Sequence, residues 1–217
     1  MKAYYNIEQG TEEWHEIRYG KIGGTLAGGL LTKGDTLLQQ VLSEKTEDFE
    51  MDYDAYVSPE MQRGYELEPN AIVKLEEYTG VKFLKAGWLQ SEENELLGIS
   101  PDGISECETV SCEIKCPGSK KHIQTLLANE IPLDNIDQCI HYFTVNPKLK
   151  QLHFCSFRPE NKYKPLFVKT LTIESMVNIG TNAKPVMKMI AEVVGMAKIE
   201  ANKLSKQIEE KLTELSF

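Results

Sequence analysis

The sequence contains no stretch of about 18 consecutive apolar residues, which is the length that a membrane-spanning helix requires. Its first ten residues, MKAYYNIEQG, lack the basic and then apolar layout of a secretory signal peptide. We therefore expect a cytoplasmic protein with no membrane partner. The five cysteines are then expected to stay reduced, because disulfides persist mainly in oxidising compartments.

The histidines do not have the spacing of a metal site, and the chain has no internal repeats. The four histidines are far apart in the sequence, so each is expected to be structural: His15, His122, His141 and His153. There are no internal repeats, low-complexity tracts or obvious linkers. With 217 residues, 41% of them hydrophobic and 26% charged, the chain is predicted to form a single domain over residues 1–217.

Hydrophobic periodicity and helix-capping residues predict an α/β chain. Helices are expected at about 11–20, 35–46, 58–80, 119–128 and 134–144, and strands at 81–90, 96–100, 110–116, 151–157 and 165–173. Pro69 falls inside the third helix, where we expect a break or kink. A last helix is expected to start near Glu174 or Ala183 and to run to Leu215, and Pro185 could bend it. This order gives an N-terminal helical part over about 1–80 and a C-terminal helix over about 183–215.

Positive charge is scarce in the first half of the chain, although not in the second. The net charge is −9, with 22 acidic and nine basic residues in 1–110 and with 11 acidic and 15 basic residues in 111–217. Residues 115–169 contain nine basic and four acidic side chains. A local basic face can bind phosphate while the whole protein is acidic, although solvated surface lysines explain the same counts.

One short stretch combines acids and a lysine in a pattern that suggests chemistry. In GISPDGISECETVSCEIKCP, residues 98–117, Asp102 lies on a Pro-Asp-Gly turn. Strand alternation then places Ser111, Glu113 and Lys115 on one face of the next strand, away from the cysteines. An isolated E-x-K of this kind usually faces solvent. Together with Asp102, however, the two carboxylates can chelate a hard divalent ion, and Lys115 can orient or deprotonate a water.

This stretch resembles the active-site signature of the PD-(D/E)xK nuclease superfamily, and in particular that of the phage lambda-type exonucleases, which are viral recombination nucleases. EEWHEIRYGKIGGT (12–25) is similar to that family's N-terminal W-x-x-x-R-x-G-x-I segment, and RGYELEPNA (63–71) to its G-x-x-x-E-x-x-A helix. DQCIHYF supplies a glutamine on a following helix. The resemblance spans about residues 10–160 and implies a restriction-endonuclease-like α/β (α+β) core, with a central mixed β-sheet flanked by helices.

The resemblance implies a role for each matching position. Asp102 and Glu113 would be metal ligands, with the Ile114 carbonyl completing the protein's share of the shell. Lys115 would activate or position the attacking water. Glu68 would be a helix glutamate near the metals, and Gln138 would support the lysine and the water. Three further residues would lie at the 5′-phosphate of the DNA end: Arg18, Thr25 and Ser100.

Two departures and two ordinary alternatives accompany this match. Glu113 follows Asp102 by eleven positions, one more than we expect for the family's best-known member. Where that member has a further upstream aspartate, this chain offers Glu92 or Glu93. The tryptophans Trp14 and Trp88 are interpreted as core or half-buried anchors. The cysteine spacing 107, 112, 116 does not favour the four-cysteine cluster of some related nucleases, since no cysteine precedes 107.

The predicted function is therefore a Mg²⁺-dependent deoxyribonuclease, with Mn²⁺ able to substitute. By resemblance it would digest linear double-stranded DNA from 5′ ends to leave 3′ overhangs, as a trimeric ring beside a single-strand annealing protein. It would be encoded by a phage or prophage and act in the cytoplasm of the bacterial host. Two alternatives stay open: a restriction or repair endonuclease of the same superfamily, and an inactive nuclease fold that only binds DNA.

Overall fold

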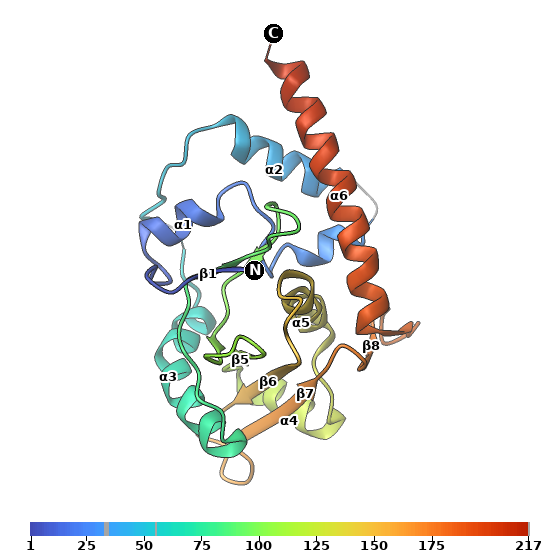
Figure 1. Cartoon of the computed structure of the whole chain (residues 1–217). Coiled ribbons are helices and arrows are strands. Elements are labelled where there is room, and N and C mark those ends of the chain that lie inside the picture. Colours follow the sequence, from blue (N-terminus) through green and yellow to red (C-terminus); the bar gives the residue numbers. More distant parts are fainter. Residues whose placement is uncertain (33–34, 55, 217) are drawn as a thin grey trace.

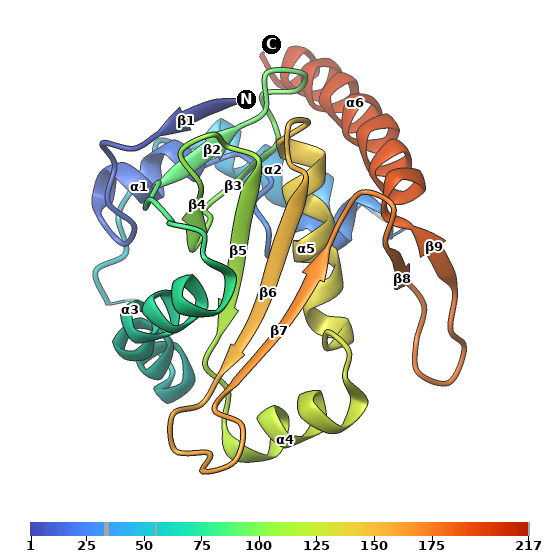
Figure 2. The same ribbon diagram turned by 60° about the horizontal axis from the view of Figure 1, so that its bottom comes forward.

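The larger β-sheet places the predicted E-x-K strand at its centre. A computed structural model describes residues 1–32, 35–54 and 56–216. The sheet has the order β4-β5-β6-β7, with β5 parallel to β6 and the other pairs antiparallel, so that it is mixed as predicted (Figure 2). Its strands are β4 (Gly103–Ile104), β5 (Val110–Lys115), β6 (Gln151–Phe157) and β7 (Leu166–Leu171).

Helices cover the two faces of this sheet. On one face, helix α3 (Pro59–Thr79) buries Ala71 and Leu75 against the cysteines of β5 and β6. On the other face, helix α5 (Leu133–Val145) belongs to the main hydrophobic core together with Phe154 of β6. The strand β5 therefore lies between two apolar layers, with α3 and α5 on either side of it (Figure 1).

A second sheet lies beside the first and is built from very short strands. It has the order β1-β2-β3 and is antiparallel, with β1 (Lys2–Tyr4), β2 (Trp88–Gln90) and β3 (Gly98–Ile99). The strand predicted over 81–90 is thus shorter, although Leu84 makes a single antiparallel bridge to Ile104. The strands β1 and β4 were not predicted, because two or three residues are too few to show alternation.

The N-terminal helices begin at the predicted capping residues. Thr11 caps α1 (Glu12–Arg18), and Ser58 caps α3, each by accepting a hydrogen bond from a main-chain N–H three residues later. The intervening elements are η1 (Ala27–Leu30), a single 3₁₀ turn, and α2 (Thr36–Thr46).

The break expected at Pro69 is wrong, since α3 is continuous from Pro59 to Thr79 and ends at Gly80, whose φ is 73°. The proline removes one hydrogen bond, but the buried residues that follow it hold the next turns against the sheet.

The C-terminal part corrects the prediction of where the last helix starts. Helix α4 (Ser119–Ala128) is as predicted, but residues after Glu174 form a hairpin of β8 (Met176–Asn178) and β9 (Met187–Met189). Asn178 closes the hairpin by accepting hydrogen bonds from the main-chain N–H groups of Gly180 and Val186. Helix α6 therefore begins only at Ile190, and Pro185 lies before it.

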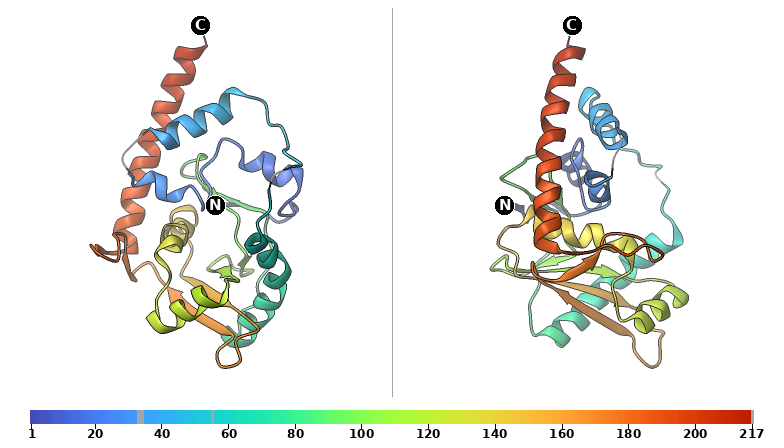
Figure 3. Two further views of the ribbon diagram at one scale, coloured as in Figure 1. Left: turned by 180° about the vertical axis from the view of Figure 1, so that it is seen from behind. Right: turned by 90° about the vertical axis from the view of Figure 1, so that its right-hand side faces the viewer.

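Helix α6 (Ile190–Leu215) closes one side of the core. Its buried residues recur at helical spacing from Ile190 to Ile208 and pack against α2 and α5. Beyond them the helix projects away from the rest of the chain (Figure 3). Among the described residues, no helix combines the length and the apolar character needed to cross a membrane.

Candidate active site

Glu113 is a buried carboxylate at the centre of the candidate site. Its side chain is only 1% exposed, because alternation along β5 turns it toward α5. The Tyr142 hydroxyl donates a hydrogen bond to Oε2 at 2.8 Å, and the Lys115 ammonium lies 2.5 Å from Oε1. The alternative in which the E-x-K motif faces solvent is therefore wrong for Glu113. Both partners offset the cost of burying this carboxylate.

Asp102 lies against the same strand. It sits between β3 and β4, and its Oδ2 accepts a hydrogen bond from the main-chain N–H of Ile114 at 2.5 Å. Burial raises the pKa of Asp102 well above its ordinary value, and the negative charges of Glu113 and Glu68 raise it further. The structure thus brings these carboxylates close enough to repel one another, and their combined charge favours a bound cation.

Lys115 and Gln138 meet as a pair beside Glu113. The lysine Nζ donates a hydrogen bond to Oε1 of Gln138 on α5 at 3.2 Å. Burial opposes the charge on Lys115, but Glu113 and Asp102 outweigh it and raise the pKa of the lysine. The ammonium form is therefore favoured in this arrangement, so Lys115 is better suited to orient a water or offset phosphate charge than to remove a proton.

Glu68 approaches from the opposite side, on α3. Its carboxylate lies 3.3 Å from the ammonium group of Lys85, which is largely exposed. Its negative charge also raises the pKa of Asp102. The charge of Glu68 therefore acts on the acidic group, while its role there stays a prediction.

The donor set has the chemistry of a hard divalent cation site. Asp102 and Glu113 offer carboxylate oxygens, and the Ile114 carbonyl adds a neutral one, which are ligands that Mg²⁺ accepts. Although both oxygens of Glu113 have partners, each has a second lone pair. In the described part of the chain, no group of three or more His, Cys, Asp or Glu side chains is arranged to hold a metal ion. The ligand set of Asp102, Glu113 and the Ile114 carbonyl stays a prediction.

Arg18, at the end of α1, lies against two tryptophan rings. Its guanidinium lies 3.9 Å from the ring centre of Trp14 and 5.9 Å from that of Trp88. Burial lowers the pKa of Arg18, and its Nε is buried without a hydrogen-bond partner among the described residues. As predicted, Trp88 is buried and Trp14 is half-buried. An unpaired Nε of this kind is a donor that an anion could engage.

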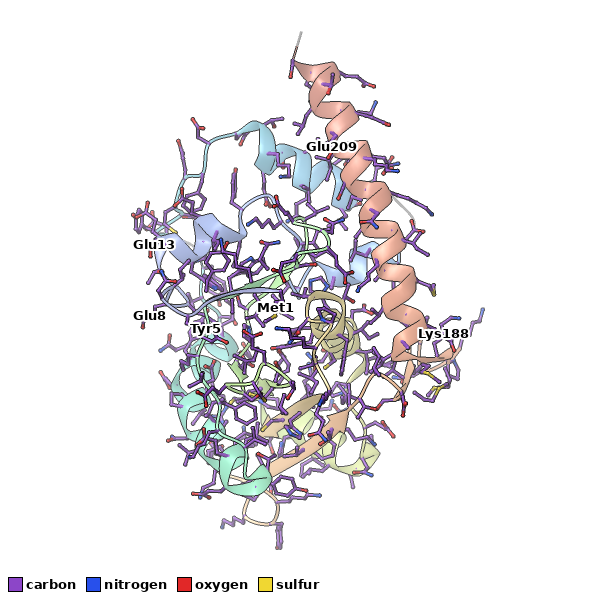
Figure 4. All side chains as sticks on the ribbon, viewed as in Figure 1. Met1, Tyr5, Glu8, Glu13, Lys188 and Glu209 are labelled. Atoms are coloured by element: carbon purple, nitrogen blue, oxygen red, sulfur yellow. The ribbon has the colours of Figure 1, made fainter. Side chains whose placement is uncertain are left out.

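Ser100 shares a tryptophan contact with Arg18, whereas Thr25 lies on a segment next to Gln138. The Trp14 indole donates a hydrogen bond to the Ser100 hydroxyl at 2.8 Å, so Ser100 and Arg18 share one aromatic support. Thr25 is exposed and follows Gly24, which packs directly on Gln138. The three predicted phosphate contacts therefore lie on segments that adjoin the site. Side chains occupy the space between α1, α3 and α5 that the ribbon leaves open (Figure 4).

Glu92 and Glu93 are engaged elsewhere. Glu92 pairs with the N-terminal amine of Met1, and Glu93 pairs with Lys198 of α6 at 2.7 Å. The structure thus does not bring either residue to Asp102. The interpretation of one of them as a further acid of the site has no support from this geometry.

Sequence analysis missed two residues of α5 that organise the site. Tyr142 follows Gln138 by four positions and His141 by three, so all three share one helix face. The buried His141 lies 3.1 Å from the carbonyl of Ile22 and 3.0 Å from that of Gly98, and it links the segments that carry Thr25 and Ser100. The only sequence signal was the helical spacing from Gln138, which does not identify the partners.

The cysteines take no part in these contacts. Four of them are buried, and Cys112, Cys116 and Cys155 line the opposite face of the sheet, toward α3. Cys107 is exposed, and hydrogen bonds with Ser105 and Thr109 lower its pKa to about 7.

Comparisons with known proteins give a family match and a fold match. Residues 13–148 match the YqaJ-like viral recombinase domain. No curated protein sequence matches the chain. The crystal structure of an alkaline exonuclease from Laribacter hongkongensis is similar with a TM-score of 0.70 and 23% identity, over 95% of this chain and 100% of that one. The same enzyme in complex with dAMP gives the same values.

A phage-related exonuclease from Haemophilus somnus 129PT is similar with a TM-score of 0.52 and 13% identity, over 91% of this chain and 97% of that one. At these identities the structural likeness concerns the fold. It confirms the predicted restriction-endonuclease-like architecture.

Proposed function

This chain belongs to the YqaJ-like viral recombinase family, and from that premise we propose that it is a Mg²⁺-dependent deoxyribonuclease that digests linear double-stranded DNA from its 5′ ends and leaves 3′ overhangs. The observation that carries the proposal is the convergence of Asp102, Glu113, Lys115 and Gln138 at one place in an exonuclease-like fold. The related enzyme from L. hongkongensis was crystallised with dAMP, a mononucleotide of the kind that an exonuclease releases.

In this proposal each residue has a defined task. Asp102, Glu113 and the Ile114 carbonyl would hold Mg²⁺, or Mn²⁺ in its place. When bound, such an ion neutralises phosphate charge and lowers the pKa of a coordinated water. Lys115, held by Gln138 and Glu113, donates hydrogen bonds that orient the attacking water and offset charge on the scissile phosphate. Glu68 adds negative charge beside the ligands.

End recognition is assigned to Arg18 and its neighbours. A guanidinium can grip a terminal 5′-phosphate through two directional hydrogen bonds. Stacking on Trp14 fixes the plane of the guanidinium, and the hydroxyls of Thr25 and Ser100 supply further donors. Gripping the 5′ end while Lys115 acts on the next phosphodiester sets the polarity of digestion.

The assembly and its setting are part of the same proposal. A ring of three copies would thread the duplex and keep the enzyme on one DNA molecule through successive cuts. A single-strand annealing protein would then receive the 3′ overhang. A phage- or prophage-encoded enzyme of this type would act in the cytoplasm of the bacterial host.

One assay tests the activity against its alternatives. Linear duplex labelled at either the 5′ or the 3′ end is incubated with Mg²⁺ or with EDTA, beside covalently closed circular duplex. We expect Mg²⁺-dependent release of the 5′ label first and an intact circle. Cutting of the circle would favour an endonuclease, and no release from any DNA would favour a binding module.

Lys115→Ala is the matched control for this assay. It removes a group that acts on water and leaves the metal ligands in place. We therefore expect it to abolish cleavage while DNA and metal are still bound. Near-normal turnover by this variant would contradict the assignment. Replacing Mg²⁺ by Ca²⁺ is expected to trap the DNA complex uncut, because Ca²⁺ prefers larger and looser coordination.

A further inference from the structure

The loop that joins β6 to β7, residues 158–165 (RPENKYKP), presents an aromatic side chain to solvent between two lysines. Tyr163 is 98% exposed, the largest exposed fraction of any large hydrophobic side chain in the described part of the chain. Lys162 and Lys164 on either side of it are exposed as well. A fully exposed ring gains nothing for folding and is accessible to a partner outside the chain.

The backbone of the loop is ordered, although its tip is exposed. The Asn161 side chain accepts hydrogen bonds from the main-chain N–H groups of Tyr163 and Lys164, each at 3.0 Å. At the base of the loop, the Arg158 N–H donates to the Pro165 carbonyl at 2.8 Å. The tip is therefore held in one conformation before any ligand arrives, which reduces the entropy that binding would cost.

Three contacts fix the loop to elements of the active site. Glu160 accepts two hydrogen bonds from Arg63 of α3, at 2.9 and 2.7 Å. Arg158 donates to the carbonyl of Pro117, two residues after Lys115, at 3.2 Å. His122 of α4, the third anchor, lies 2.9 Å from the carbonyl of Lys164.

The same contacts make the loop cationic. Glu160 is its single acidic residue, and hydrogen bonds from Arg63 lower the pKa of Glu160 to about 2. Its charge is therefore engaged with Arg63, on the side of the loop that faces α3. The tip presents only Lys162 and Lys164, on a chain whose net charge is −9. The local positive charge of the tip favours a polyanion as its partner.

The loop lies at the edge of the sheet where the candidate catalytic strand ends. The strands β5 and β6 are parallel, with Lys115 opposite Ser156, so both reach this edge together. The loop starts at Arg158, two residues after Ser156, and extends beyond the ends of β5, β6 and β7 (Figure 2). A DNA strand that leaves the region of Lys115 toward α4 would pass this loop.

We infer that Lys162, Tyr163 and Lys164 form a binding element for single-stranded DNA that lies outside the catalytic group. The tyrosine ring stacks on an unpaired base, and the two lysines contact the phosphates on either side of that base. Stacking requires an unpaired base, since a duplex does not expose the faces of its internal bases. The inference rests on the proposed function for the source of the strand, which is the 3′ overhang left by digestion.

The test is a binding measurement in EDTA, so that nothing is cleaved. Fluorescence anisotropy with a labelled oligothymidylate gives the Kd of the full chain and of Tyr163→Ala. We expect about a tenfold weaker Kd for Tyr163→Ala, from the usual contribution of base–aromatic stacking, and near-normal binding for Tyr163→Trp. Tyr78→Ala is the matched control, because Tyr78 is 69% exposed on α3 and should leave Kd unchanged.

The lysines give an independent readout. The double variant Lys162→Gln, Lys164→Gln should reduce the slope of log K against log salt by roughly 1.4, which corresponds to two phosphates of a single strand. Circular dichroism confirms that each variant is folded. An unchanged Kd in folded Tyr163→Ala, or no binding of the oligonucleotide by the unaltered chain, overturns the inference. A partner protein, and not DNA, would then be the reason for the exposed ring.

The outcomes separate this inference from the proposed nuclease. If digestion from 5′ ends is observed while Tyr163→Ala binds single strands normally, the loop inference alone fails. If no DNA is cleaved but Tyr163→Ala loses single-strand binding, the nuclease proposal alone fails and the loop remains a DNA-binding element.

Discussion

Tyr142→Phe removes one oxygen atom and should weaken both the fold and the candidate metal site. The Tyr142 ring is fully buried, so phenylalanine preserves the packing. The lost hydroxyl is the one 2.8 Å from the buried Glu113 carboxylate and 3.1 Å from the Cys112 carbonyl. A hydrogen bond to a charged group contributes about 1.5–3 kcal/mol. The free energy of unfolding should therefore fall by about 2 kcal/mol, which lowers the melting temperature by roughly 4–8 °C at this chain length.

Two measurements check this prediction. Thermal unfolding in EDTA reports the stability change without metal, and calorimetric titration with Mg²⁺ reports the affinity. We expect the affinity to fall roughly 10- to 100-fold, as it does when the partner of a metal ligand is removed. Tyr78→Phe, at an exposed position, is the control and should change neither quantity. If Tyr142→Phe kept both the melting temperature and the Mg²⁺ affinity of the unaltered chain, Glu113 would not depend on this hydroxyl.

Three further predictions follow from the same region. In Gly24→Ala the new Cβ would lie 2.9 Å from Cγ of Gln138, so the amide should move off Lys115, and cleavage should slow roughly 10- to 100-fold at unchanged DNA affinity. Burial lowers the pKa of His141 to about 4. The stability that the neutral, buried imidazole gives the fold is therefore complete above pH 6.5 and is lost as the pH falls toward 4. Urea unfolding over this range should show the free energy of unfolding fall by about 3 kcal/mol, a fall that His141→Asn lacks. Arg18→Ala should slow digestion of 5′-phosphorylated ends strongly and of 5′-hydroxyl ends little, with partial recovery in Arg18→Lys; an equal proportional loss in initial rate on both ends would show that Arg18 serves general contact or the fold.

Much of the architecture was predictable because its signals are local. Alternation in β5 identified the two faces, one toward α5 with Glu113 and one toward α3 with the cysteines. Capping residues located the starts of α1 and α3, and Gly80 located the end of α3. The acids, the lysine and Gln138 were recognised from a motif whose members lie within 37 residues of one another, from 102 to 138.

The rest depends on partners that are distant in sequence. Strands such as β1 and β4 form because β2 and β5 pair with them, and two or three residues cannot show that in advance. The hairpin before α6 forms because Asn178 binds main-chain groups across the turn, a contact that local helix propensity does not include. The partners of Tyr142 and His141 are likewise 29 to 119 positions away.

The three contacts made by one face of α5 bear on how this protein can vary in length. Gln138 and Tyr142 contact β5, and His141 contacts the segments that carry Ile22 and Gly98; the three contacts occur together because successive residues on a helix turn by about 100°. Inserting or deleting a single residue before Gln138 within α5 would rotate all three side chains away from their partners at once. Because α5 is also buried almost all round, with only Asp134 and Asp137 exposed, its residue count between Leu133 and Tyr142 is fixed by geometry and few of its positions are open to substitution.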